Sequence, residues 1–219
     1  MDERVSKIIS ILSEQFPDAK SELSFKTPYE LLIAVILSAQ CTDKRVNIIT
    51  KELFKVADTP QKMAALTIEE IEEIIKSCGF YHNKARFIKS ASQDIMFRFG
   101  GKVPQTLEEL QTLDGVGRKT ANVVFAVAFG GQAIAVDTHV FRVSNRLGIV
   151  KAKTPLEAEM QLMAAIDKSL WSKSHHYILL HGRYVCKSAR PLCEKCLLQD
   201  LCPYYAKIKE SAVNKNKTV

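Results

Sequence analysis

Four threonines, each followed three residues later by a glutamate, mark helix starts in this chain of 219 residues. The pairs are Thr27 with Glu30, Thr67 with Glu70, Thr106 with Glu109, and Thr154 with Glu157. In such a capping box the hydroxyl and the carboxylate each bond a backbone N–H that the first helical turn leaves without a partner. Pro28 and Pro155 follow two of the threonines, at the position where a helix tolerates a missing N–H. These repeated signals predict an all-α fold.

The spacing of apolar residues supports the same prediction. Helical i, i+3, i+4 spacing near the N-terminus is kept by Val5, Ile8, Ile9, Leu12 and Phe16. The stretch "ELLIAVILSAQ" (30–40) is apolar on every side and predicts a buried central helix. The strand candidate "AIAV" (133–136) is short enough to be a connector. From about Lys207 the chain is lysine-rich and aperiodic, which predicts a basic, disordered tail over 207–219.

The formal net charge of +7 favours a polyanionic partner such as a nucleic acid. The N-terminus, "MDERVSKIIS", is charged early and lacks the apolar core of a signal peptide. No apolar run approaches the roughly 18 residues that a membrane-spanning helix needs. We therefore expect a cytoplasmic protein, and the lack of an N-terminal extension favours a prokaryotic source.

Four cysteines lie close together in "CKSARPLCEKCLLQDLC", namely Cys186, Cys193, Cys196 and Cys202. In a cytosolic chain such a cluster indicates a bound metal more often than disulfides or four free thiols. Four-cysteine zinc sites usually combine two short pairs, and only Cys193 and Cys196 form one here. The wider outer spacing favours an iron–sulfur cubane, although spacing alone leaves zinc open. Cys41 and Cys78 lie far away and are interpreted as small core residues.

The stretch "LDGVGRKTANVV" (113–124) places two glycines before a lysine and an apolar helical run. A phosphate-binding P-loop is excluded, because Leu113 and Arg118 stand where that motif requires glycine. The glycines permit a tight turn with positive φ, and the next helix then presents its first N–H groups to an anion such as a DNA phosphate. With a helix from Thr106 to about Leu113, this predicts a helix–hairpin–helix. An ordinary tight turn between packed helices is the alternative.

Lys119 follows this turn, in the first helical turn and next to Arg118. The helix dipole and the neighbouring charge both disfavour a cation there, and so favour a neutral, nucleophilic amine. A solvated or phosphate-paired lysine is the commoner alternative. In "AVDTHVFRVSNRLG", Asp137 precedes an amphipathic helix and is interpreted either as its N-cap or as a carboxylate near Lys119. Such a carboxylate would stabilise an oxocarbenium-like sugar or move protons.

Together these residues resemble the bacterial endonuclease III family of DNA glycosylases and abasic-site lyases. The motifs that carry the resemblance are the cysteine spacing, "LSAQCTD", "LDGVGRKTANVV", "AVDTHVFRVSNRLG" and "LHGRYVC". The resemblance covers about residues 5 to 205. It implies an all-α fold of two lobes with the active site between them. Residues 22–131 would form a six-helix domain with the helix–hairpin–helix at about 106–129, and 1–21 with 132–206 would form a domain holding a [4Fe–4S] cluster on Cys186, Cys193, Cys196 and Cys202.

The resemblance also implies a reaction on damaged double-stranded DNA, by a monomer acting at the nucleoid. By likeness, Lys119 matches the nucleophile and Asp137 the catalytic carboxylate. An oxidised pyrimidine would be flipped out of the duplex, because its sugar carbon is not accessible inside the stack. The Lys119 amine would displace the base at C1′ and form a Schiff base, and β-elimination would nick the strand 3′ to the lesion.

Further DNA contacts are implied by the same likeness. Gln40 matches a residue that fills the gap left by the flipped base, and Phe80 either wedges into the helix or packs in the core. The hairpin residues expected at a phosphate are Gly115, Val116, Gly117 and Arg118. His139 either points into the cleft or is a polar residue of its helical turn.

Lys187 and Arg190 lie between the first two cysteines, where the resemblance implies phosphate contacts. The cluster would then act as a staple that shapes a basic loop; two solvated charges are the alternative. At Asp114 the sequence departs from the family, whose hairpin usually has proline there. The turn loses a constraint on φ and gains a negative charge, which is expected to weaken DNA binding slightly.

Three other functions are considered. A related adenine glycosylase lacks the hairpin lysine and usually adds a large C-terminal domain. It also uses a glutamate in the helix matching "ELLIAVILSAQ", whereas here no carboxylate lies between Leu31 and Gln40. A non-catalytic, cluster-bearing DNA-binding protein would not need Lys119 and Asp137 together. A structural zinc protein would be colourless, whereas we expect a brown protein.

Overall fold

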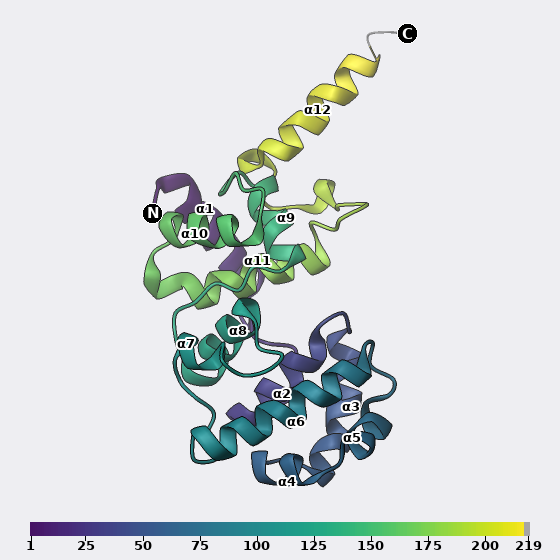
Figure 1. Ribbon diagram of the computed structural model, residues 1–219. Coiled ribbons are helices and arrows are strands. Elements are labelled where there is room, and N and C mark those ends of the chain that lie inside the picture. Colours follow the sequence, from purple (N-terminus) through teal and green to yellow (C-terminus); the bar gives the residue numbers. More distant parts are fainter. Residues whose placement is uncertain (217–219) are drawn as a thin grey trace. The chain divides into compact units, whose positions relative to one another are not determined.

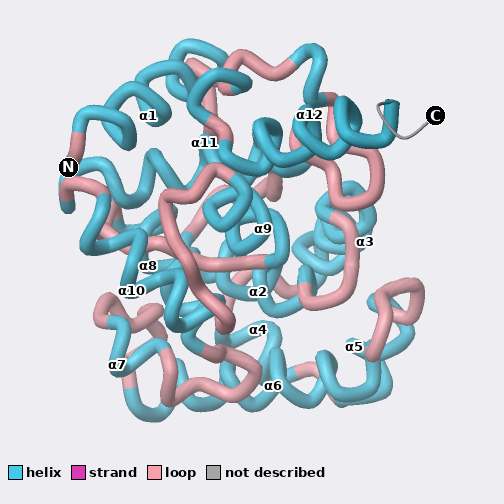
Figure 2. The backbone as a smooth tube through the Cα atoms, turned by 90° about the horizontal axis from the view of Figure 1, so that it is seen from above, coloured by secondary structure: helices cyan, strands magenta, loops and turns pink. Residues whose placement is uncertain are grey.

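The computed structural model describes residues 1–216 and consists of helices and loops, with no strand in that range (Figure 2). The all-α prediction is confirmed. The strand candidate at 133–136 is an irregular, buried connector. None of the helices in the described part of the chain is long and apolar enough to cross a bilayer.

The chain divides into two compact units, named here unit 1 (residues 1–20 and 134–219) and unit 2 (residues 21–133). The resemblance implied a domain over residues 22–131, with boundaries close to those of unit 2. Each unit has its own hydrophobic core. The two units are therefore described separately.

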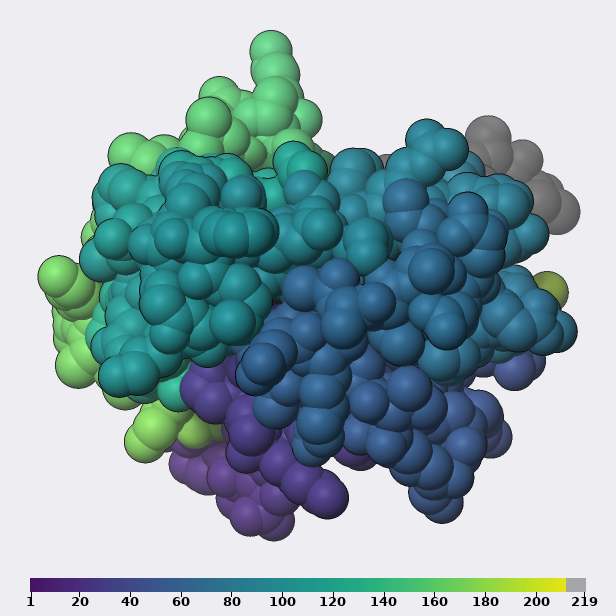
Figure 3. Space-filling model, turned by 60° about the horizontal axis from the view of Figure 1, so that its bottom comes forward, coloured from purple at the N-terminus to yellow at the C-terminus, as the bar shows by residue number. Residues whose placement is uncertain are grey.

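Unit 2, whose residues run from purple-blue to teal in Figures 1 and 3, is built around one buried helix. Its helices are α2 (Pro28–Ser38), α3 (Asp43–Val56), α4 (Pro60–Ala65), α5 (Ile68–Ile75), α6 (Tyr81–Arg98), α7 (Leu107–Leu110) and α8 (Arg118–Phe129). Every residue of α2 from Tyr29 to Leu37 is buried, and α3, α6 and α8 pack against this helix. The unit has one helix more than the six that the resemblance implies, and α7 and α8 are the two helices of the predicted hairpin.

Unit 1 packs the N-terminal helix against segments from the second half of the chain. Its α-helices are α1 (Glu3–Gln15), α9 (Thr138–Arg146), α10 (Pro155–Ala165), α11 (Trp171–Tyr184) and α12 (Pro203–Asn216). The predicted apolar face of α1 lies in this core, and α9 and α10 pack side by side. Gly182 lets α11 approach α9 closely, because a Cβ there would lie 2.9 Å from the Cβ of His139.

The basic tail differs from the expectation of disorder. Helix α12 continues through Asn216 and projects beyond the rest of unit 1 (Figure 1); residues 217–219 lie outside the described part of the chain. The stretch "YAKIKESAV" (205–213) has neither glycine nor proline and contains several strong helix formers. The Lys209 amine also lies 5.4 Å from the ring centroid of Tyr205, one turn earlier.

The predicted threonine caps are all present, but only one is a complete capping box. The hydroxyls of Thr27, Thr67, Thr106 and Thr154 each accept the N–H of the glutamate three residues on. At Thr67 the Glu70 carboxylate accepts the cap's own N–H in return. The carboxylates of Glu30 and Glu157 instead reach one residue further back, to the N–H of Lys26 and of Lys153. Both of these helices begin with proline, whereas α5 does not.

Thr67→Ala is expected to lower the free energy of unfolding by about 1 kcal/mol, because it leaves the Glu70 N–H without its partner. Glu70→Gln is the matched control, since an amide oxygen still accepts the Thr67 N–H. Urea denaturation of the wild type and both variants checks this. Equal losses in the two variants would contradict the role given to the threonine hydroxyl.

Candidate functional site

The predicted hairpin joins α7 to α8 in unit 2. Gly115 adopts φ +76°, and a Cβ there would lie 2.8 Å from the Cβ of Phe87 on α6. Val116 is buried and its N–H bonds the carbonyl of Leu113 at 3.1 Å. Gly117 is the N-cap of α8 and provides no side-chain cap. The first N–H groups of α8 can therefore serve an acceptor from outside the protein.

Helix α6 holds the hairpin at Asp114, the residue that stands where the hairpin of the resembled family usually has proline. The Ser90 hydroxyl donates to Oδ2 of Asp114 at 2.5 Å. The Arg98 guanidinium donates to the hydroxyl of Thr112 at 3.0 Å. These side-chain bonds tie the turn to α6 where a proline ring would otherwise restrict it.

Lys119 occupies the first turn of α8 and is exposed to solvent. Its amine makes no hydrogen bond or ion pair with any residue that the structure describes. Arg118, beside it, is also exposed. The amine is thus accessible to a substrate, as a nucleophile must be.

Asp137 is the N-cap of α9, so that interpretation is confirmed. Its Oδ1 accepts the N–H of His139 at 2.9 Å and that of Val140 at 2.8 Å. Its Oδ2 has no hydrogen-bond partner among residues 1–216. The cap uses one oxygen and leaves the other for different chemistry. Asp137 lies in unit 1 and Lys119 in unit 2, so the expected pair is divided between the units.

His139, in the first turn of α9, faces a neighbouring arginine. Its Nδ1 lies 3.2 Å from Nη2 of Arg142. The same guanidinium donates to the carbonyl of Gly182 at 2.9 Å. His139 is half-buried, as expected of a polar residue in the first turn of a packed helix.

Gln40 and Phe80 share an unusual backbone conformation in unit 2. Their φ angles are +52° and +58°, and they are the non-glycine residues with positive φ in the described chain. Such a left-handed conformation costs about 1–2 kcal/mol per residue. The two turns abut, since a Cβ on Gly79 would lie 3.3 Å from the carbonyl oxygen of Gln40. Phe80 is 63% exposed, so the core-packing interpretation is wrong.

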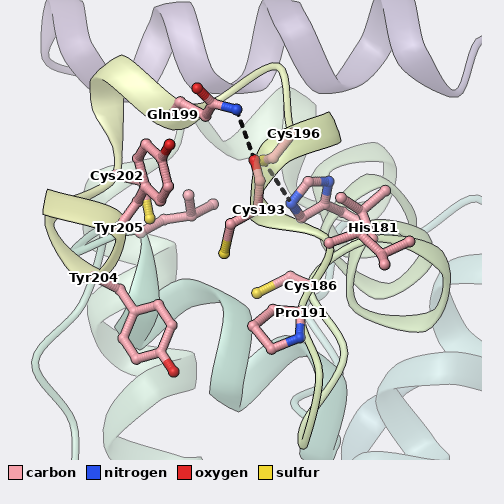
Figure 4. Close-up of a pocket in the computed structure, with 12 residues that line it drawn as sticks. His181, Cys186, Pro191, Cys193, Cys196, Gln199, Cys202, Tyr204 and Tyr205 are labelled. Atoms are coloured by element: carbon pink, nitrogen blue, oxygen red, sulfur yellow. Dashed lines mark hydrogen bonds between the residues drawn. The ribbon is translucent and has the colours of Figure 1, made fainter. Parts of the chain in front are cut away.

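The four clustered cysteines surround one pocket in unit 1. Figure 4 shows the sulfurs of Cys186, Cys193 and Cys202 turned towards a shared space between the loop and the start of α12. The fourth, Cys196, has its Sγ 3.7 Å from Nε2 of His181. The rest of the lining is largely apolar or aromatic, including Pro191, Leu192, Tyr204 and Tyr205. All four thiols are free of disulfide bonds.

Burial shifts the pKa values of several side chains that line this pocket towards their neutral forms. Burial, and then the neighbouring cysteines, raise the pKa of Cys193, and burial is also the main cause of the raised pKa of Cys196. Burial lowers the pKa of His181 to about 4, so its ring is neutral at pH 7. Four thiolates so close together would repel one another unless a metal centre balanced their charge. No three His, Cys, Asp or Glu side chains in the described part of the chain are arranged around a single ion.

Two arginines of α9 hold the loop after Cys186, and the sequence analysis missed both. Arg146 donates to the carbonyls of Lys187 (2.8 Å) and Ser188 (3.0 Å). Arg142 donates to the carbonyl of Cys186 at 3.1 Å. Their i, i+4 spacing on an amphipathic helix is the signal that could have identified them. Lys187 and Arg190 are exposed on the loop that these bonds shape.

Cys41 and Cys78 lie in unit 2, away from this pocket. Cys78 is buried, as predicted, and Cys41 is half-buried beside it. Burial, and then the hydrogen bond with Cys78, raise the pKa of Cys41.

Residues 33–168 match the HhH-GPD superfamily of base excision DNA repair proteins. The endonuclease III of Bacillus subtilis (strain 168) is 50% identical over 192 residues, which cover 87% of this chain and 88% of that protein. The endonuclease III of Escherichia coli (strain K12) is 43% identical over 202 residues, covering 92% and 96%.

Solved structures of DNA glycosylases are also similar to this chain in fold. A structure of a trapped endonuclease III–DNA covalent intermediate matches with a TM-score of 0.91 and 47% identity, over 95% of this chain and all of that one. A thermostable thymine-DNA glycosylase matches with a TM-score of 0.82 at 24% identity, over 94% and 98%. The second likeness shows the fold alone.

Gly115→Ala is expected to destabilise unit 2 and loosen the hairpin, because the new Cβ meets Phe87 and positive φ disfavours alanine. We expect a loss of about 1–3 kcal/mol in the free energy of unfolding. Gly117→Ala is the matched control, since its φ is −79° and a Cβ there meets nothing within 4 Å. Urea denaturation measures both, and a control as unstable as Gly115→Ala would contradict the prediction.

Proposed function

Because this chain belongs to the endonuclease III family, within the HhH-GPD superfamily of base excision DNA repair proteins, we propose that Lys119 is its nucleophile and Asp137 its catalytic carboxylate. The protein is a base excision repair enzyme, a DNA glycosylase and DNA-(apurinic or apyrimidinic site) lyase. The observation that carries the assignment is the exposed amine of Lys119, without a partner in the described chain, directly after a glycine hairpin. A buried or ion-paired lysine there would have argued against it.

The proposed substrate is an oxidised pyrimidine in duplex DNA, flipped out of the stack. The Lys119 amine attacks C1′ of the sugar, and the base leaves as the C1′–N bond breaks. Ring opening gives a Schiff base between Lys119 and C1′. Loss of a proton from C2′ then expels the 3′ oxygen, which nicks the strand. In this proposal the second oxygen of Asp137 stabilises the cationic sugar or carries these protons.

The proposed DNA-binding surface combines a phosphate site with two side chains that enter the DNA double helix. The N–H groups following Gly115, Val116 and Gly117 would bind a backbone phosphate, with Arg118 adding charge. Gln40 would fill the gap left by the flipped base, and Phe80 would separate neighbouring bases. Their exposure and the contact between their turns support this role. His139, Lys187 and Arg190 are proposed as further contacts from unit 1.

We propose a [4Fe–4S] cluster on Cys186, Cys193, Cys196 and Cys202. The donor set fits, since four sulfurs line one largely apolar pocket. The cysteine spacing supports the cluster over a single zinc, because four-cysteine zinc sites usually combine two short pairs and only Cys193 and Cys196 form one here. When bound, the cluster would supply structural cross-linking, and Arg142 and Arg146 would fix the basic loop beside it. The enzyme is further proposed to act as a monomer on DNA in the cytoplasm of a prokaryote.

Lys119→Gln is expected to retain binding to damaged duplex DNA and to lose strand nicking, because only the nucleophilic amine is removed. Borohydride trapping on duplexes containing thymine glycol or an abasic site should give a covalent protein–DNA band with the wild type and none with the variant. Lys119→Arg keeps the charge without forming a stable Schiff base and should also give none. Lys153→Gln, at another exposed lysine, should behave as the wild type. Nicking by Lys119→Gln at the wild-type rate would show that the nucleophile is elsewhere.

Cys196→Ala is expected to lose iron and weaken DNA binding before it affects the chemical step, because the cluster shapes the loop and not the reacting atoms. Iron content, the brown absorbance and binding to an abasic-site analogue measure this. Cys41→Ala, outside the pocket, should keep its iron. A Cys196→Ala protein without iron that bound DNA normally would refute the role of the cluster as a staple.

A further inference from the structure

Lys84 is a buried lysine in unit 2, with 3% of its surface exposed. It lies in the first turn of α6, and its ammonium points into the unit. Nζ donates to the carbonyls of Leu37 (2.9 Å) and Ala39 (2.5 Å) and to Sγ of Cys78 (3.1 Å). An ammonium has three hydrogens to donate, so all three are used. A buried charge satisfied in this way is fixed in position, because moving it would break bonds that water cannot replace.

The three acceptors stand just before the two left-handed residues. Leu37 lies in the last turn of α2 and Ala39 is its C-cap, immediately before Gln40. Cys78 lies two residues before Phe80, and its thiol also donates to the carbonyl of Leu37 at 3.3 Å. Lys84 itself follows Phe80, and its own N–H bonds the Phe80 carbonyl at 3.1 Å. One side chain thus joins the turn that presents Gln40 to the turn that presents Phe80.

We propose that Lys84 is a positioning residue for base extrusion. From inside unit 2, its ammonium sets the spacing of Gln40 and Phe80, the two side chains proposed to enter the DNA. This inference rests on the proposed function. Both turns adopt a conformation that their side chains disfavour, so something must hold them, and the ammonium bonds acceptors in both turns. Lys84 touches neither DNA nor the reacting atoms. Its effect should therefore appear only where Gln40 and Phe80 are needed.

Lys89 offers a matched control from the same helix. Its amine donates to the carbonyls of Ala64 (3.1 Å) and Leu66, which join α4 to α5. It too is a partly buried lysine that satisfies backbone carbonyls of another segment, but none of the proposed DNA-contacting residues lies in that segment. A purely structural role for Lys84 would make the two lysines equivalent.

The test compares Lys84→Met and Lys89→Met on two substrates in single-turnover assays. One substrate is a duplex containing thymine glycol, whose base must be extruded. The other is a single strand with a preformed abasic site, which needs the lysine chemistry without extrusion. For Lys84→Met we expect the rate on the duplex, relative to the single strand, to fall about tenfold to a hundredfold, the range typical of a misplaced positioning group. Lys89→Met should keep the wild-type ratio, and Lys84→Arg should recover part of it.

An equal loss on both substrates in Lys84→Met, or the same change of ratio in Lys89→Met, would overturn the inference. If the wild type gives no borohydride-trapped band with the abasic strand, the proposed function fails and the inference with it. If the wild type acts on both substrates and the ratio in Lys84→Met is unchanged, the inference alone fails.

A second variant keeps the test decisive should Lys84→Met not fold. Cys78→Ala removes one acceptor of the ammonium and the thiol's own bond to the Leu37 carbonyl, but little volume. It should shift the same ratio in the same direction by a smaller factor, about threefold. An unchanged ratio in a folded Cys78→Ala protein would count against the bridge between the two turns.

Discussion

Unit 2 depends on the burial of α2 on every side. A helix that removes all of its apolar surface from water stabilises its unit strongly, but its last carbonyls are then buried without partners in the helix. Water is excluded there, so the protein must supply the donors. The ammonium of Lys84 and the thiol of Cys78 do so. The bonds of Lys84 and Cys78 join Leu37 and Ala39, just before Gln40, to Cys78, just before Phe80, so the end of the central helix and the proposed DNA-facing turns form one structure.

Unit 1 meets a different constraint, because four thiols must share one pocket. Arg142 and Arg146 of α9 bond the loop beside the pocket. Arg146 bonds two loop carbonyls, lies 3.5 Å from Sγ of Cys186 and stacks 4.4 Å from the ring centroid of Tyr204. It therefore connects the loop, a sulfur and the start of α12. Positive charge near thiolates stabilises them, and the same residue shapes the exposed loop that carries Lys187 and Arg190.

Much of the fold could be predicted from local signals. Threonine caps and apolar periodicity located most helices, because both act within a few residues of chain. The hairpin glycines and the cysteine spacing located the candidate sites for the same reason. Lys84 could not be found in this way. In "YHNKARF" it looks like a solvated charge at a helix start, and its burial results from packing against segments more than forty residues earlier. The arginine contacts of the loop also depend on tertiary context.

The left-handed backbone at Gln40 and Phe80 lowers the stability of the fold at two positions that the proposed activity needs. Glycine adopts such a conformation with little steric cost, so glycine at either position would relieve strain in a turn while deleting the side chain proposed to enter DNA. A search for heat-resistant forms of this protein would be drawn to these two positions. Variants with glycine at these positions would resist unfolding better but would be poor repair enzymes, because they lack the side chains proposed to enter DNA.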